Sequence, residues 1–329
     1  MNPAHVDFLR CPETGGALRL RDGASMEGER IRSGMLDCED GAHAYPIIDF
    51  IPRFVPLENY SSNFGLEWRI HARTQYDSHT GLPLSERRFF EETRWPRDLE
   101  GEVILEVGCG SGRFTEHALG TGAFVVSLDY SSAVESNYGS NGVNPNLLVA
   151  QGDIFRLPLP AQRFDRVVCI GVLQHTPDPR RAFHSLVPFV NPGGSLVVDV
   201  YRKTLEKYFA VKYYARPFVK NIPPDRLYGL VKRYVDFMWP IAGVIRCIPR
   251  IGPMINWALG IADHSREGLS GDVLREWAYL NSYDMFSPIH DHPQTLESVR
   301  GWFREAGFRE FEVHYGYNGI EARGTVPAP

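Results

Sequence analysis

The sequence predicts an α/β fold built on a doubly wound, mostly parallel sheet, and two observations support this prediction. First, helix-like segments separate five apolar runs within residues 101–204: VILEV (103–107), AFVVSLDYS (123–131), NLLVAQGDI (146–154), FDRVVCIGVL (164–173) and GGSLVVDVY (193–201). Strands that are buried on both faces of a sheet read as such near-continuous apolar runs. Second, strands and helices that alternate at this spacing form right-handed crossovers between parallel strands.

The regions on either side of this core follow other patterns. Residues 1–56 read as short strands joined by Gly and Pro, and residues 57–100 are polar-aromatic and predicted to be helical. The aromatic and basic stretch 205–281 is expected to form a helical insert. Residues 282–329 contain the segment TLESVRGWFREAGF (295–308), whose apolar residues fall on one helical face. Two alternating runs after it predict an antiparallel hairpin at the edge of the sheet.

Composition and charge narrow the class of protein. Hydrophobic residues make up 43% of the chain, which is ordinary for a globular protein, and the net charge of −5 argues against a whole-surface nucleic-acid binder. The five cysteines are odd in number and widely spread, which predicts no disulfide framework and favours a reducing, cytoplasmic compartment. No signal peptide and no membrane-spanning run is expected.

A glycine-rich turn, GCGSG (108–112), follows the first apolar run, and acids stand at the ends of the next two runs. In a doubly wound sheet, ligands bind beyond the carboxyl ends of the strands. Asp129 can accept hydrogen bonds from both hydroxyls of a ribose, and Asp153 can meet an adenine amino group. Glu106 suits a ligand with cationic groups better than it suits a pyrophosphate. The alternative is that Glu106 and the glycines only shape a turn.

Four segments together resemble class I S-adenosylmethionine-dependent methyltransferases of the type 11 group: VILEVGCGSGRFTEHA, LDYSSAV, QGDIFRLPLPAQRFDRVVCIGVLQHTPDPRRAF and VNPGGSLVV. The resemblance covers roughly residues 60–204 and the final helix and hairpin. It implies a Rossmann-like core with S-adenosylmethionine as the cofactor. The residues that it implies around the cofactor are Glu106, Gly108, Cys109 and Gly110 at the methionine moiety, Asp129 at the ribose, Tyr130, Ile154 and Asp153 at the adenine, and Ile170 and Gly171 at the floor of the site.

Similar enzymes close a segment that precedes the first strand over the donor as a lid. Here the segment is NFGLEWRIHARTQYDSHTG (63–81). An aromatic ring can face a sulfonium by cation–π attraction, and Arg69 can pair with the donor carboxylate. The lid candidates are Phe64, Trp68, Arg69, Thr74 and Gln75. The alternative for each is ordinary helix packing.

Three residues are candidates for catalysis. Methyl transfer needs a base only if the acceptor carries a proton that must leave. His175 follows the fourth apolar run and is expected to face the cleft, as a base or as a structural residue. His290 precedes the last helix, where a base, a loop-capping residue and a metal site shared with His292 are alternatives; we predict no metal. Tyr201 ends the fifth run and is expected to contact the acceptor.

The insert is locally basic in an acidic protein. Residues 202–250 hold eleven Lys and Arg but only three acids. Three interpretations stay open: a packed helical cap over the acceptor, a pocket for an anionic or lipid-linked acceptor, and a surface that contacts a membrane or another copy of the chain.

The N-terminal part, residues 1–56, resembles a small zinc-ribbon-like module called Trm112-like. Cys11 and Cys38 match its pattern, but Thr14 and Gly41 stand where the family has its other two cysteines. A structural zinc takes four ligands, and His43 would raise the number here to three. We therefore predict a zinc-free module that its apolar residues hold together.

The leading functional hypothesis is methyl transfer from S-adenosylmethionine to oxygen or nitrogen of a small-molecule acceptor, such as a natural product, a sugar or a lipid-linked metabolite. Methylation of an RNA base is the alternative, against which the acidic net charge counts. A third hypothesis is a protein that binds S-adenosylmethionine without transferring methyl. The sequence leaves the acceptor and the oligomeric state open.

Overall fold

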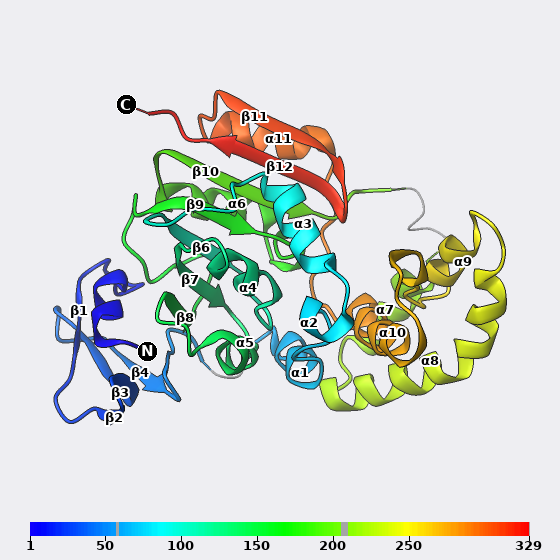
Figure 1. Cartoon of the computed structure of the whole chain (residues 1–329), viewed down its shortest axis with the longest axis horizontal. Helices are drawn as coiled ribbons and strands as arrows, with labels where there is room; N and C mark the ends of the chain where they lie inside the picture. The colour runs from blue at the N-terminus through cyan, green and yellow to red at the C-terminus, as the bar shows by residue number, and fades with distance from the viewer. Residues whose placement is uncertain (57–58, 205–209, 329) are drawn as a thin grey trace.

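The computed structural model describes residues 1–56, 59–204 and 210–328 (Figure 1). Residues 57–58 of the predicted lid and residues 205–209 of the predicted insert lie outside the described residues. A seven-stranded sheet, ordered β11-β12-β10-β9-β6-β7-β8, forms the centre. Its strands are β6 (Val103–Val107), β7 (Phe124–Asp129), β8 (Leu147–Gln151), β9 (Phe164–Cys169), β10 (Val190–Val200), β11 (Glu310–Gly316) and β12 (Gly319–Thr325).

The strand directions confirm the predicted α/β fold. Strands β6 to β10 pair in parallel, as the apolar runs indicated. The predicted C-terminal hairpin forms, but its second strand lies inside the sheet: β12 pairs antiparallel with both β10 and β11, so β11 is the edge strand. The order of the strands reverses at β6, which lies between β7 and β9, and such a switch point is where doubly wound sheets bind ligands.

Helices cover both faces of the sheet because successive side chains of each strand point to opposite faces. Ile104 of β6 belongs to a cluster with residues of α4 (Arg113–Leu119), whereas the adjacent Leu105 belongs to a cluster with residues of α6 (Pro179–Leu186). Both side chains are fully buried. The other helices beside the sheet are α3 (Leu84–Thr93) and α5 (Val134–Asn141) on the α4 face, and α11 (Leu296–Glu305) on the α6 face.

The N-terminal module takes the place of a helix on the α6 face. The connection 152–163 between β8 and β9 contains no helix, and buried residues of the module join the same apolar cluster as β7 and β8. The ring of Phe8, for example, stacks on Phe124 of β7 at 4.6 Å. The elements of the module are η1 (Pro3–Phe8), β1 (Leu18–Leu20), β2 (Ser25–Glu27), β3 (Arg30–Cys38), β4 (Ala44–Ile48) and β5 (Ile51–Pro52).

The lid and the insert form a helical layer beyond the carboxyl ends of the strands, on the opposite side of the molecule from the module (Figure 1). In the figure, α8 and α9 extend away from the sheet. Within the described residues, no helix combines the length and the hydropathy that a bilayer span needs. The helices are α1 (Ser62–Ile70), α2 (Asp77–Thr80), α7 (Val211–Val219), α8 (Pro224–Arg246), α9 (Gly252–Ala258) and α10 (Gly271–Phe286).

Candidate functional site

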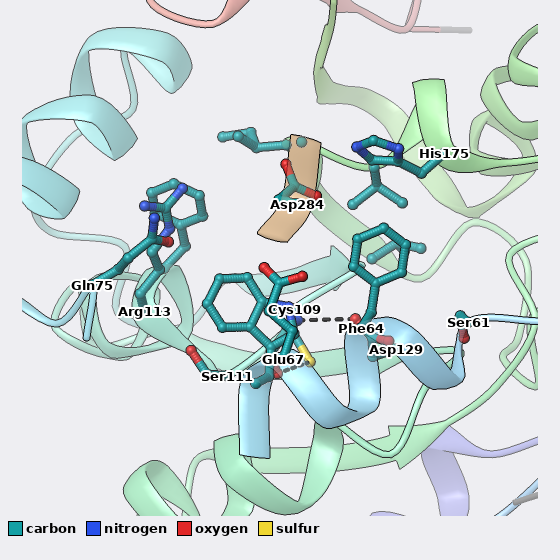
Figure 2. Close-up of a pocket in the computed structure, with 18 of the residues that line it drawn as sticks. Ser61, Phe64, Glu67, Gln75, Cys109, Ser111, Arg113, Asp129, His175 and Asp284 are labelled. Atoms are coloured by element: carbon teal, nitrogen blue, oxygen red, sulfur yellow. Dashed lines mark hydrogen bonds between the residues drawn. The ribbon is translucent and has the colours of Figure 1, made fainter. Parts of the chain in front are cut away.

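A cavity of about 230 Å³ lies at the carboxyl ends of the central strands, and residues of α1 and α10 form part of its wall. Figure 2 shows Gln75 and Arg113 on one side of it, Phe64 and His175 on the other, and Glu67 between them. Thirteen of the residues singled out in the sequence line this cavity: Phe64, Trp68, Gln75, Gly108, Cys109, Gly110, Asp129, Tyr130, Ile154, Ile170, Gly171, His175 and Tyr201. Segments far apart in the chain therefore meet at one place.

Two residues predicted for the lid lie outside the cavity lining. Arg69 follows Trp68 on α1, so the turn of the helix carries its side chain away from the cavity to the exposed surface. Thr74 is buried between the lid and α10, where its hydroxyl donates a hydrogen bond to Glu276 Oε1 at 2.6 Å. Its hydroxyl thus joins the lid to the insert.

Asp153, His290 and Glu106 also lie outside the lining. The Oδ1 atom of Asp153 accepts a hydrogen bond from the backbone N–H of Phe155 at 2.9 Å, which closes a turn after β8. The His290 ring packs edge-on against Tyr60 at 5.5 Å, and its backbone carbonyl is what reaches the site. Glu106 points into the layer below the glycine turn.

Gly108 shapes the floor of the cavity because its backbone has a φ of +82°, in the left-handed region that favours glycine. Its N–H donates to the carbonyl of Leu128 at 2.7 Å, which ties the turn after β6 to the end of β7. A Cβ atom at Gly108 would lie 2.1 Å from Val172 Cγ2. Both the conformation and the space therefore exclude a side chain here.

We expect Gly108→Ala to destabilise the protein more than Gly101→Ala does. Gly101 has a φ of +85° but nothing within 4 Å of an added Cβ, so it isolates the conformational cost, about 1 to 2 kcal/mol. The clash with Val172 adds about 1 to 3 kcal/mol for Gly108→Ala alone. Urea unfolding of the two variants measures the difference. If both variants lose the same free energy of unfolding, the turn accommodates the added Cβ at Gly108 without cost.

Asp129, the last residue of β7, is held in place by its own loop. Its Oδ2 accepts the N–H of Gly110 at 2.9 Å, and its Oδ1 accepts the N–H and the hydroxyl of Ser131 at 2.8 and 2.7 Å. Burial raises the pKa of the Asp129 carboxyl, and the hydrogen bonds from Ser131 and Gly110 oppose that shift. The carboxylate is thus oriented at the cavity wall with lone pairs left for further donors.

Glu106 lies beneath the turn as a buried carboxyl. Its Oε2 accepts hydrogen bonds from Thr115 Oγ1 at 2.5 Å and from Ser127 Oγ at 2.8 Å. Burial raises the pKa of the Glu106 carboxyl from 4.5 to about 7, although the two hydroxyls lower it. Its direct contacts therefore connect β6, β7 and the first helix after the turn.

This raised pKa predicts how stability depends on pH. The folded state holds the proton of Glu106 more tightly than the unfolded state, so this group's contribution is full below pH 4.5 and is lost as the pH rises through about 7. Glu106→Gln removes the titration, so its stability relative to the native protein should rise between these pH values, by on the order of 3 kcal/mol at most. Urea unfolding across this pH range tests it, with the exposed Glu100→Gln as the control. A pH-independent difference would contradict the assignment.

Four charged residues that the sequence did not single out also line the cavity: Glu67, Arg88, Arg113 and Asp284. Burial, together with the nearby charge of Asp284, raises the pKa of Glu67 well above its usual range. The Oε2 atom of Glu67 has no hydrogen-bond partner among the described residues, and neither has Oε1 of the lining residue Gln75. Two residues that line the cavity therefore each hold a buried oxygen atom without a hydrogen-bond partner.

The two arginines differ in their partners. Arg88 donates to Glu92 Oε1 at 2.6 Å and to Asp199 Oδ2 at 2.7 Å, so its charge is neutralised. Arg113 has no carboxylate within ion-pair distance in the described part of the chain, and its guanidinium lies over the Phe114 ring at 4.4 Å. Burial and the nearby charge of Arg88 lower the pKa of Arg113 to about 10. The one sequence signal for Arg113 was its position directly after the glycine turn.

His175 lines the same cavity and has a defined orientation. Its Nδ1 is 3.1 Å from the backbone oxygen of His290. Because a carbonyl oxygen only accepts hydrogen bonds, Nδ1 carries the proton, and Nε2 of the neutral ring is then unprotonated. The ring contacts Phe64 at 5.3 Å and Tyr201 at 5.4 Å, and the Tyr201 hydroxyl donates to Asp284 Oδ2 at 3.3 Å. This end of the cavity therefore offers a nitrogen that can take up a proton.

A further group of candidate ligands lies in the N-terminal module. Ligand atoms of Cys11, Asp40 and His43 lie within 4.8 Å of one another. They already have partners within the protein: His43 Nδ1 and Asp40 Oδ2 are 2.6 Å apart, and Cys11 Sγ is 3.2 Å from the Tyr45 hydroxyl. That the module holds no zinc stays a prediction.

Known proteins resemble the central part of the chain. Residues 105–198 match a family model described as "Methyltransferase domain". Proteins named ubiquinone biosynthesis O-methyltransferase are similar: that of Coxiella burnetii is 33% identical over 43% of this chain and 59% of its own length. That of Alkalilimnicola ehrlichii is 34% identical over 34% of this chain and 47% of its own length. The chain therefore spans less than two thirds of these relatives.

Among solved structures, a phosphoethanolamine N-methyltransferase from Haemonchus contortus in complex with S-adenosyl-L-methionine is similar. It is 16% identical with a TM-score of 0.39, and the match covers 70% of this chain and 38% of that one. At these values the likeness carries no argument about function. The matched family model coincides with the strands and the turn that build the cavity floor. Residues 105–198, the core of this chain, therefore match the methyltransferase domain family.

Proposed function

We propose that this protein transfers the methyl group of S-adenosylmethionine to an oxygen or nitrogen atom of a small-molecule acceptor. One observation carries the proposal: the glycine turn, Asp129, His175 and Tyr201 all line a single cavity. The names of the curated relatives, which are O-methyltransferases, favour oxygen.

The open groups of the cavity suit the donor. Arg113 has no ion-pair partner among the described residues and can bind the methionine carboxylate. The sequence had predicted this role for Arg69, which is exposed and lies outside the cavity lining. Gln75 and Glu67 each have a side-chain oxygen atom without a hydrogen-bond partner, and these oxygens suit the methionine ammonium. Asp129 can accept from the ribose hydroxyls. When bound, the donor supplies a methyl group on a cationic sulfonium, which leaves as a neutral thioether.

The chain's own residues then position and deprotonate the acceptor. The rings of Phe64 and Trp68 line the cavity and can face a cation. His175 Nε2 takes the proton of an acceptor hydroxyl, while the carbonyl of His290 holds the ring in the required tautomer. The hydrogen bond between Tyr201 and Asp284 keeps this side of the cavity polar. Much of the remaining catalysis is positioning.

A labelling experiment tests the proposed function. The full chain is incubated with donor that carries a labelled methyl group and with a cell extract, and the products are separated into small-molecule, nucleic-acid and protein fractions. Label in the small-molecule fraction, absent with Asp129→Ala, is the expected result. Label that nuclease releases would instead support RNA methylation, and no label in any fraction would exclude methyl transfer.

We also propose a reducing, cytoplasmic compartment. All five cysteines are free thiols, and four of them are buried. This supports the proposal because proteins of oxidising compartments commonly pair their cysteines.

A further inference from the structure

The insert leaves large apolar side chains in solvent. Of the seventeen exposed large hydrophobic residues among the described residues, ten lie between Val211 and Met254. Phe218 is 82% exposed, Phe237 71% and Val244 72%. Single exposed apolar residues need no explanation, but such a concentration marks an interaction surface.

The large apolar residues of α8 that are exposed lie on one face of the helix. Leu230, Phe237, Ile241 and Val244, here called the apolar stripe, follow one another at spacings of seven, four and three residues. These spacings place them in one row along a helix. A separate row, which includes Leu227, Val231 and Val235, is buried against α10. Because α8 packs against α10 through the buried row, the apolar stripe is available for another contact.

Basic side chains accompany the apolar stripe. Arg226 and Arg233 are exposed and stand four residues before Leu230 and Phe237, on the same side of α8. Exposed Lys220, Lys232 and Arg250 lie nearby in the sequence. Asp225 is the one exposed acid between residues 211 and 258, since Asp236 is half-buried and paired with Arg275 at 2.5 Å. The surface is therefore apolar and positive in a protein whose net charge is −5.

We propose that this face of α8 binds the surface of a bilayer that contains anionic lipids. A helix with an apolar row beside basic residues lies in the interfacial plane, with the apolar row among the acyl chains and the cations at the headgroup phosphates. A second copy of the chain fits less well, because two such faces would gather the basic residues of both copies at one contact with few acids to pair them.

The bilayer surface would lie close to the cavity. Helix α8 packs on both α1 and α10, which carry the lining residues Glu67 and Asp284. The Tyr228 hydroxyl on α8 lies 2.8 Å from Nε2 of His71, at the end of α1. Helix α8 therefore lies directly against two helices that line the cavity.

Flotation of the full chain with lipid vesicles tests the proposal. We expect the chain to float with vesicles of phosphatidylcholine mixed with phosphatidylglycerol, more weakly with phosphatidylcholine alone, and less as salt is raised. Phe237→Ser combined with Val244→Ser should lower the partition coefficient at least about tenfold, because two apolar side chains lose their burial. Val143→Ser, at a position 84% exposed on the core, is the matched control and should float like the native chain.

A variant with two arginines replaced separates the electrostatic contribution to vesicle binding from the apolar one. Arg226→Gln combined with Arg233→Gln should remove most of the preference for anionic vesicles, about fivefold per charge, while the folded state stays intact. The proposal is overturned if the native chain floats with neither vesicle, if it shows no preference for the anionic vesicle, or if the serine variant floats as well as the native chain. A dimer in sedimentation velocity that the serine variant dissociates would also overturn it, in favour of a second copy. Vesicle binding requires no donor, so its failure would leave the proposed function standing.

Discussion

Replacing Asp129 by alanine is expected to abolish measurable binding of S-adenosylmethionine. The carboxylate is oriented by the N–H groups of Gly110 and Ser131, and it stands at the end of β7, where a ribose can meet it. Two hydrogen bonds to a charged acceptor contribute about 1.5 to 3 kcal/mol each, so the Kd should rise by roughly two to four orders of magnitude. Isothermal titration calorimetry measures the change.

The same substitution removes bonds that hold the glycine turn, so its effect on folding must be separated from its effect on binding. Asp129→Asn keeps an acceptor oxygen and the shape of the side chain but lacks the charge. It should show an intermediate affinity, and its melting temperature should lie between those of the native protein and Asp129→Ala, because its one remaining oxygen can still accept an N–H of the loop. Near-normal affinity of Asp129→Ala for the donor would refute the assignment of this residue to the ribose.

A second large effect is expected at His175, which lines the same cavity. His175→Ala should lower the rate of methyl transfer by roughly two to four orders of magnitude, the usual contribution of a general base, and leave the donor Kd within about twofold. The reason is that Nε2 is the unprotonated nitrogen that the cavity offers to an acceptor. The measurement uses the small-molecule fraction that the native protein labels.

Rescue by an added base distinguishes a general base from a histidine that only shapes the cavity. Added imidazole should restore part of the rate of His175→Ala, because a free base can take the acceptor proton in its place. His184→Ala provides the control, because His184 lies on α6 outside the cavity lining and pairs with Glu305 at 3.1 Å. A rate loss that imidazole does not rescue would assign His175 a positioning role.

The sheet and the donor end of the cavity could be predicted from the sequence because their signals are local. Strand β6 has the predicted bounds, since VILEV is apolar except for one acid and a glycine turn ends it. Asp129 was recognisable because an acid at the end of a buried strand has to lie at the sheet edge. The order of β11 and β12 in the sheet could not be predicted, because a hairpin pattern does not show which of its two strands pairs with the rest of the sheet.

The acceptor end depended on the tertiary structure. Glu67 and Asp284 come from α1 and α10, and in the sequence each stands among residues of the same kind that face elsewhere. The lid illustrates the reason: Trp68 lines the cavity and the neighbouring Arg69 is exposed, and only the packed orientation of α1 decides between them. The exposed stripe of α8 was likewise hidden, because its residues and the buried row both read as apolar at helical spacing.

The sequence by itself thus determined the type of fold, the glycine turn and the carboxylate beyond β7, because periodicity and strand ends are encoded within a few residues. The tertiary structure alone decided which helix faces close the cavity, that Arg113 and Glu67 remain open at it, and which row of α8 stays in solvent. Those outcomes depend on how helices far apart in the chain pack against one another, and packing is a property of surfaces that no local pattern contains.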